Sequence, residues 1–125
     1  MKDRIILLKI RSYLKRIERI LGIINELNED KILELDESYA LTQFITNIYS
    51  LVQNISDDKI ADRMLLVIGR GLITCRNISS HDYDSLNWDK VKILCKKLIS
   101  KNTNITIEEC LEIANENEQN QKKYE

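Results

Sequence analysis

Four side chains whose types could take part in chemistry lie within residues 76–83 of this chain. They are Arg76, Asn77, His81 and Tyr83, and His81 is the only histidine in the sequence. Histidine is the one side-chain type whose ordinary pKa suits proton transfer near neutral pH. Arginine offers a planar fork of donors that fits phosphate oxygens. This segment is therefore the first candidate for a functional site.

These groups suit the cleavage of RNA by its own 2′-hydroxyl. The reaction needs a base, an acid and stabilisation of charge on the phosphate, and a histidine can take one proton and return another. It leaves a 2′,3′-cyclic phosphate and requires no metal ion. The alternative is that Arg76 and His81 form a purely structural pair at the end of a helix.

Arg76 and His81 do not lie on one face of a straight helix. Successive helical residues turn by about 100°, which separates these two positions by about 140°. They converge if the helix ends before the histidine, or if two copies of the segment meet across a two-fold axis in a homodimer. Arg63 and Arg70 share a helical stripe with Asn77 through their spacing of seven, so both arginines are candidates for RNA binding.

The elements that position this segment are predicted to be helices, because apolar residues recur at three- and four-residue steps. The expected helices cover about residues 3–27, 36–55, 58–80, 88–99 and 107–115. Asp3, Asp36 and Asn87 are candidate N-caps, and residues 56–58 are expected to form a turn and cap. Thr106 and Glu109 match a capping box, which predicts that the fifth helix begins there.

The pattern predicts an all-α fold, an antiparallel up-down four-helix bundle with a short fifth helix, because short connections make neighbouring helices antiparallel. Residues 1–125 are expected to form a single domain with a polar tail that frays from about residue 116. The absence of proline and the 43% of hydrophobic residues agree with a helical globular chain. Gly69 and Gly71 match no phosphate-binding glycine motif and predict close packing of the third helix against a neighbouring backbone.

The composition of the chain argues against two functional classes, metal-binding proteins and membrane proteins. Cys75, Cys95 and Cys110 form no CxxC pair, and one histidine cannot complete a Cys/His zinc site, so we expect free or buried thiols and no metal site. No leader or run of roughly 20 apolar residues is visible, which predicts a cytoplasmic protein with no membrane partner.

The formal net charge is -1, yet the basic residues are concentrated in the first helix. Seven of them precede residue 20: Lys2, Arg4, Lys9, Arg11, Lys15, Arg16 and Arg19. Such a helix can contact phosphates, although a solvated surface is the commoner role, and net charge alone does not exclude RNA as a partner.

The arrangement of Arg76, Asn77, His81 and Tyr83 resembles the RX4HXY motif of the HepT-like toxins, a branch of the HEPN superfamily. The likeness extends over about residues 41–98, including the helix that starts at Trp88. It implies a dimeric helical bundle and a metal-independent endoribonuclease whose cleft lies between the two protomers. Arg76 and His81 would be catalytic, Asn77 would assist them, and no cofactor is implied.

The resemblance also implies a partner, a cognate minimal nucleotidyltransferase that acts as the antitoxin of a type II toxin–antitoxin system. That enzyme would transfer AMP from ATP to Tyr83. Tyr49 and Ser50 occupy positions where family members often carry Gly-Glu. Two alternatives therefore stay open: a non-catalytic substrate-binding partner subunit of a nucleotidyltransferase, and a plain dimeric bundle with a structural Arg–His pair.

Overall fold

The chain is built from α-helices. The computed structural model describes the backbone of residues 2–80 and 86–124, and the side chains of residues 2–69 and 86–123. Within these ranges there are no strands, and the helices are α1 (Asp3–Ile24), α2 (Glu29–Leu33), α3 (Asp36–Gln53), α4 (Asp58–Ser80), α5 (Trp88–Leu98) and α6 (Lys101–Tyr124). The all-helical class predicted from the sequence is confirmed.

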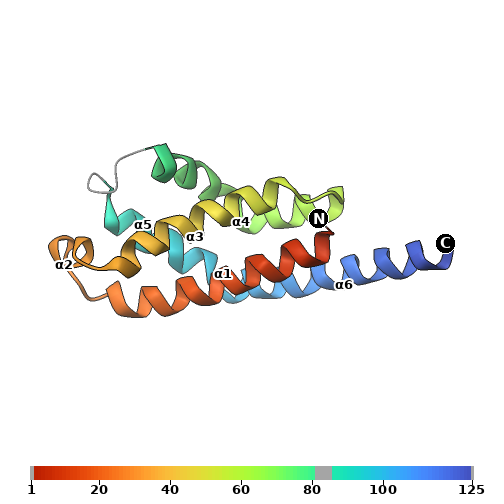
Figure 1. The fold of residues 1–125 in the computed structure, drawn as a ribbon, viewed down its shortest axis with the longest axis horizontal. Helices are drawn as coiled ribbons and strands as arrows, with labels where there is room; N and C mark the ends of the chain where they lie inside the picture. The colour runs from red at the N-terminus through yellow and green to blue at the C-terminus, as the bar shows by residue number, and fades with distance from the viewer. Residues whose placement is uncertain (1, 81–85, 125) are drawn as a thin grey trace.

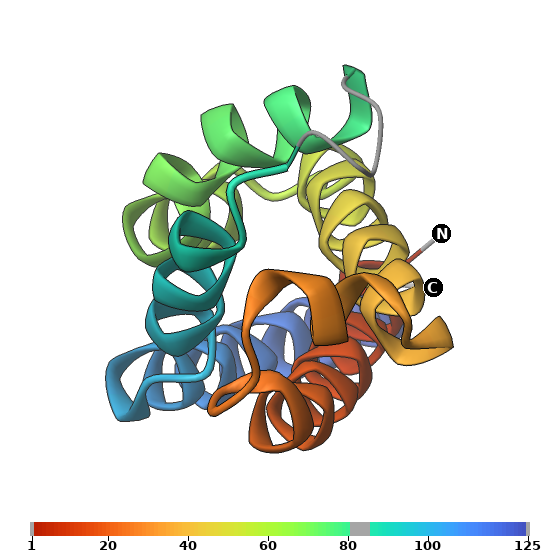
Figure 2. The ribbon, with the colours of Figure 1, turned by 90° about the vertical axis from the view of Figure 1, so that its left-hand side faces the viewer.

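The long helices pack around a shared interior. Helices α3 and α6 each pack against both α1 and α4, while α5 contacts α1 and α4 and α2 contacts α3. Figure 1 shows α1 and α6 along one side of the elongated molecule, and the end-on view in Figure 2 shows the helices arranged about a common centre. Helix α4, which carries the candidate segment, is thus held by three other helices.

The apolar stripes predicted from the sequence form the core. In α1 the buried residues at the predicted three- and four-residue spacing are Ile6, Ile10, Leu14, Ile17, Ile20, Leu21 and Ile24. In α3 they are Leu41, Ile45, Ile48 and Val52, and in α5 they are Trp88, Val91, Leu94, Cys95 and Leu98. Each fully buried aliphatic side chain stabilises the folded chain by about 1.5–3 kcal/mol before entropic costs.

The connection after α1 differs from the prediction. Helix α1 ends at Ile24 rather than near residue 27, and the short helix α2 follows. The Asn28 side chain caps α2 by accepting a hydrogen bond from the Lys31 amide at 3.0 Å. Ile32 is 1% exposed, so burial of one apolar side chain adds to the cap in holding this turn of helix. A five-residue helix has too little periodicity to be recognised in the sequence.

The predicted caps of the first two long helices are wrong. Lys2 occupies the N-cap position of α1 and Leu35 that of α3, and neither makes a side-chain cap hydrogen bond. The Asp3 carboxylate instead accepts hydrogen bonds from the Ser56 amide at 2.8 Å and the Asp57 amide at 2.9 Å. It therefore fastens the start of α1 to the turn before α4.

The predicted short fifth helix is also wrong, because α6 has 24 residues and begins at Lys101. Ser100 Oγ accepts from the Thr103 amide at 3.4 Å, and the Thr103 hydroxyl, 1% exposed, donates to the Lys97 carbonyl at 3.2 Å. These bonds start the helix before the capping box. Thr106 then lies inside α6 and donates to the Asn102 carbonyl at 3.0 Å. The backbone is helical through Tyr124, and fraying of this tail in solution stays a prediction.

The caps predicted before α4 and α5 are confirmed. Asn87 Oδ1 accepts from the Lys90 amide at 3.2 Å at the start of α5. At the start of α4, Asp57 Oδ1 accepts from the amides of Lys59 at 2.8 Å and Ile60 at 3.1 Å. The hydrogen bond from the Ile60 amide is the main cause that lowers the pKa of the Asp57 carboxyl, against a smaller opposing effect of burial.

We expect Asp57→Ala to lower the free energy of unfolding at pH 7 by about 1 kcal/mol, the usual cost of losing an N-cap. Because the pKa of Asp57 is lower in the folded than in the unfolded chain, its contribution is complete above the unfolded value. It is lost as the pH falls through the folded value, below the ordinary 3.8. Urea unfolding between pH 7 and pH 2 should therefore show a smaller acid-dependent loss in the variant than in the wild type. Asp62→Asn, at an exposed position of the same helix, is the control; equal losses for both variants would contradict the role of Asp57.

Candidate functional site

Helix α4 positions the predicted catalytic segment. Arg76 and Asn77 lie in its last turns, because α4 is helical through both positions. His81 and Tyr83 lie outside the described residues, and the side chains of Arg70, Arg76 and Asn77 lie outside the described side chains. Their contacts with one another and their catalytic roles stay predictions.

Arg63 is placed away from this segment. Its Nη1 donates to Glu109 Oε2 of α6 at 2.9 Å, and both side chains are about half exposed, at 48% and 52%. At a rise of about 1.5 Å per residue, Arg63 lies about 20 Å along α4 from Arg76. Arg63 therefore joins α4 to α6, and Glu109 pairs with it instead of completing a capping box. The RNA-binding role of Arg63 and Arg70 stays a prediction.

The middle of α4 carries an apolar surface that other helices do not cover. Leu66 is 85% exposed and Leu65 is 44% exposed. Among the described residues, a Cβ atom added at Gly69 would meet Leu65 Cβ, at 3.8 Å, and no backbone of another helix within 4 Å. The predicted close packing against a neighbouring backbone is therefore wrong at this position. Exposed apolar groups of this size often mark a surface that meets a partner.

Leu65 lies on the same side of the helix as Arg76, and Leu66 lies on the same side as Asn77. Arg76 follows Leu65 by eleven residues, which at about 100° per residue places the two positions about 20° apart around the axis of α4. Asn77 is turned by a further 100° from Arg76. A partner that covers Leu65 and Leu66 and extends about 15 Å along α4 toward its end therefore also meets the backbone of Arg76 and Asn77.

An open groove of about 1000 Å³ lies at the other end of α4, where the first turn of α1, the α3–α4 turn and α6 meet. Five of its polar side chains are engaged in hydrogen bonds or ion pairs within the protein: Asp3, Arg4, Asp57, Asn117 and Glu118. Asp3 accepts from the amides of the turn, Asp57 accepts from Asn117 Nδ2 at 2.9 Å, and Arg4 pairs with Glu118 at 3.3 Å. These contacts join α1, the α3–α4 turn and α6 to one another. We therefore interpret the groove as a junction between helices and not as a candidate functional site.

The thiols follow the sequence interpretation where the structure describes them. Cys95 and Cys110 are both buried, and burial raises the pKa of the Cys110 thiol. The side chain of Cys75 lies outside the described residues. Among residues 2–69 and 86–123, no three His, Cys, Asp or Glu side chains gather as a metal site.

Comparison of the chain with protein-family models, with curated proteins and with solved structures finds no match in any of the three. No helix in the described parts of the chain is long and apolar enough to cross a membrane. The case for a function therefore depends on the residues and the geometry given above.

Proposed function

We propose that this protein is a cytoplasmic, metal-independent endoribonuclease of the HepT-like type, the toxin of a type II toxin–antitoxin system. The observation that carries the proposal is the spacing of Arg76, Asn77, His81 and Tyr83, which begins in the last turns of the long helix α4. The helix α5 that follows, capped by Asn87 and starting at Trp88, supports the resemblance as well.

In the proposed reaction His81 accepts the proton of a ribose 2′-hydroxyl. The 2′-oxygen attacks the adjacent phosphorus, the bond from phosphorus to the 5′-oxygen breaks, and an imidazolium returns a proton to that leaving oxygen. The products are a 2′,3′-cyclic phosphate and a 5′-hydroxyl. Arg76 stabilises the extra negative charge on the phosphate, and Asn77 assists in holding it.

The proposal includes an antiparallel up-down arrangement of the long helices. The short connections between α3 and α4 and between α5 and α6 support it, because a short link returns the chain beside the helix that it leaves.

The proposal also includes a homodimer in which the two motif segments face each other. The exposed Leu65 and Leu66 support this, since around the axis of α4 Leu65 lies about 20° from Arg76 and Leu66 about 20° from Asn77. A second copy that covers these leucines would bring the two Arg76 positions toward one cleft. The register of α4 also supports a shared site, because Arg76 and His81 diverge by about 140° on one continuous helix.

The second candidate is a non-catalytic substrate-binding partner subunit of a minimal nucleotidyltransferase. It is favoured by Tyr49 and Ser50, which replace the Gly-Glu often found in the family. The Tyr49 hydroxyl accepts a hydrogen bond from Gln53 Nε2 at 2.8 Å within α3, so position 49 contributes an aromatic hydroxyl where a relative has no side chain. A nucleotidyltransferase gene beside this one would support both candidates over a plain dimeric bundle.

Incubation of the purified chain with RNA in EDTA tests the proposal. We expect cleavage in EDTA and products that carry 2′,3′-cyclic phosphate ends, detected by the need for enzymatic end repair before ligation. Cleavage that stops when EDTA is added would contradict the metal-independent mechanism. A chain that binds the nucleotidyltransferase but cleaves no RNA would favour the second candidate.

A further inference from the structure

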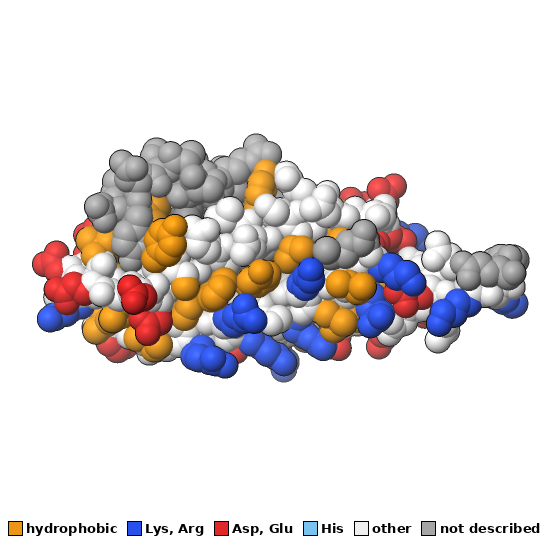
Figure 3. All heavy atoms as spheres, in the orientation of Figure 1, with side chains coloured by type: hydrophobic (Ala, Val, Ile, Leu, Met, Phe, Trp, Pro, Cys, Tyr) orange, Lys and Arg blue, Asp and Glu red, His pale blue; other side chains and the backbone are white. Residues whose placement is uncertain are grey.

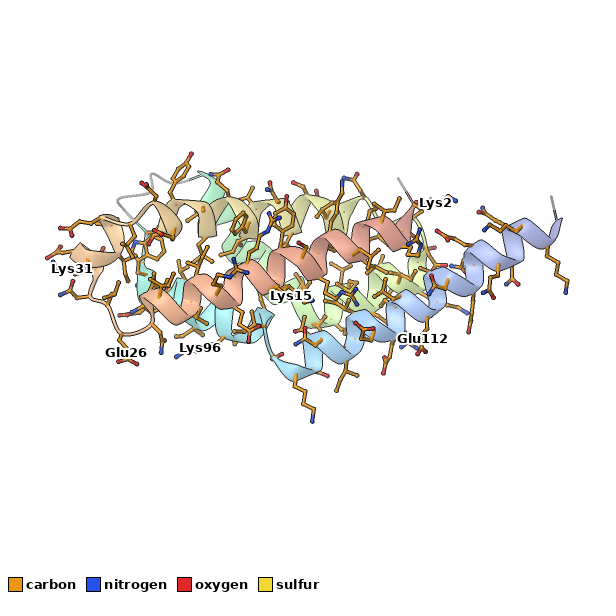
Figure 4. All side chains as sticks on the ribbon, turned by 60° about the horizontal axis from the view of Figure 1, so that its bottom comes forward. Lys2, Lys15, Glu26, Lys31, Lys96 and Glu112 are labelled. Atoms are coloured by element: carbon orange, nitrogen blue, oxygen red, sulfur yellow. The ribbon has the colours of Figure 1, made fainter. Side chains whose placement is uncertain are left out.

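Helix α1 carries basic side chains on two sides, and its contacts with α6 neutralise one of them. Arg4 Nε lies 3.3 Å from Glu118 Oε2, and Arg11 Nη1 lies 2.7 Å from Glu108 Oε1. Both glutamates belong to α6, which packs against α1 and lies beside it in Figure 4. This side of α1 is therefore used to hold the fold together.

The other side of α1 presents three cations in a row. Lys9, Arg16 and Arg19 are exposed, and Ser12 lies exposed between them at steps of three and four residues, so all four share one face. None of the three cations forms an ion pair with a carboxylate of the described residues. From Lys9 to Arg19 the row is about 15 Å long, enough to meet a few successive phosphates. We call Lys9, Arg16 and Arg19 the basic row.

Aromatic rings hold the central member of the basic row. The Arg16 guanidinium carbon lies 5.6 Å from the Tyr13 ring centre and 5.7 Å from the Phe44 ring centre. The two rings are themselves 5.5 Å apart, and Asn47 of α3 donates to the Tyr13 hydroxyl at 3.4 Å. Contact with the ring faces restricts the conformations of the Arg16 side chain. The N–H donors of its guanidinium stay available to a phosphate.

Helix α3 extends this surface as a band without charge. Residues 38–56 contain no Asp, Glu, Lys or Arg, although the outer face of a surface helix is usually charged. The exposed side chains in this band are Tyr39, Gln43, Asn47, Ser50, Gln53, Asn54 and Ser56. Figure 3 shows the uncharged band above α1, with a row of hydrophobic side chains below it and Lys and Arg side chains among and below these. It offers amides, hydroxyls and one aromatic ring, 56% exposed at Tyr39, to a partner and repels no phosphate.

We propose that the α1–α3 face binds single-stranded RNA, with the basic row on its phosphates and the uncharged band of α3 against its bases. A single strand fits this division because its backbone needs cations while its unpaired bases need stacking and hydrogen-bonding groups. The identity of the strand as RNA rests on the proposed function. Since α3 packs against both α1 and α4, a strand that crosses α3 connects the basic row to the helix that carries the catalytic segment.

Binding is tested with the full chain carrying His81→Ala, so that the RNA stays intact. The probe is a labelled, unstructured RNA oligonucleotide, and anisotropy gives its dissociation constant between 50 and 200 mM salt. In this background the row variant combines Lys9→Gln, Arg16→Gln and Arg19→Gln. We expect the row variant to bind RNA at least tenfold more weakly at the lowest salt. The slope of log K against log salt should become shallower by about 2, because each of the three lost phosphate contacts on a single strand contributes about 0.7.

The matched control removes three cations that are already paired, with Arg4→Gln, Arg11→Gln and Lys31→Gln. It has the same net charge as the row variant and should keep the salt slope of the background protein. Equal losses in the two variants, or an unchanged slope in the row variant, would overturn the proposal. The proposal would also be overturned if the protein bound an RNA duplex more tightly than the single strand. It would be overturned as well if the row variant lost binding to the nucleotidyltransferase and kept its binding to RNA. Circular dichroism checks that both variants are folded.

The wild-type chain separates this proposal from the proposed function. If the wild type cleaves RNA and the row variant binds RNA as tightly as the background protein, the proposed ribonuclease function stands and the proposed RNA-binding face is wrong. If the row variant binds RNA more weakly and the wild type cleaves no RNA, the RNA-binding face stands and the proposed ribonuclease function is wrong.

Discussion

RNA cleavage by His81→Ala is expected to fall to background while the helical fold is retained. His81 is the only imidazole in the chain, and loss of a general acid–base group usually costs about 10²–10⁴ in rate. Arg76→Ala should cost about 10²–10³, or about 2.7–4 kcal/mol of barrier, since it removes stabilisation of the phosphate charge. The measurement is kcat/KM on a labelled RNA, with circular dichroism to check the fold.

The matched control for Arg76→Ala is Arg11→Ala, because Arg11 is paired with Glu108 on the side of α1 that faces α6. We expect it to keep wild-type cleavage. Undiminished cleavage by a folded His81→Ala protein would refute the mechanism.

The shared cleft predicts a further result from the same two variants. Mixed dimers of an Arg76→Ala chain and a His81→Ala chain should recover part of the activity if an arginine and a histidine from different protomers complete one site. Each variant alone should stay inactive. An active wild-type chain that sediments as a monomer at micromolar concentration would exclude the shared cleft.

Attachment of AMP to Tyr83 is expected to switch cleavage off without unfolding the protein. Tyr83 lies two residues beyond His81 and before the Asn87 cap of α5, so a modification there would sit beside the proposed catalytic residues in the chain. The added phosphate can occupy Arg76 and compete with the phosphates of RNA, and the adenosine obstructs entry. Incubation with the neighbouring nucleotidyltransferase, ATP and magnesium, followed by peptide mass spectrometry, locates the added mass.

Tyr83→Phe is the matched variant, because it removes only the acceptor hydroxyl. It should keep cleavage activity and escape silencing by the nucleotidyltransferase. AMP found only on other residues, or silencing of the wild type with no AMP on Tyr83, would rule out this mode of control.

Local patterns in the sequence determined the helical class and the inward faces of the helices. The α1 stripe from Ile6 to Ile24 is buried as its spacing predicts, because the helical period alone decides which side chains share a face. The Asn87 cap was predictable for a similar reason, since its acceptor reaches an amide three residues away. The candidate site could be recognised in the same way, as residue types at fixed spacing along residues 76–83.

Tertiary structure decided the partners of the charged groups. Asp3 is suited to cap its own helix, yet its carboxylate accepts from the amides of Ser56 and Asp57, which are 53 and 54 residues away in the chain. Glu109 is suited to a capping box, yet it pairs with Arg63.

The basic residues of α1 were divided in the same way, because packing against α6 brought glutamates to Arg4 and Arg11 while Arg16 was held by the rings of Tyr13 and Phe44. A carboxylate or a guanidinium group can form hydrogen bonds or ion pairs with many different groups, so its residue type alone does not select its partner. Which one it meets depends on which helices the burial of apolar faces brings within about 3 Å of it, and that is a property of the whole fold.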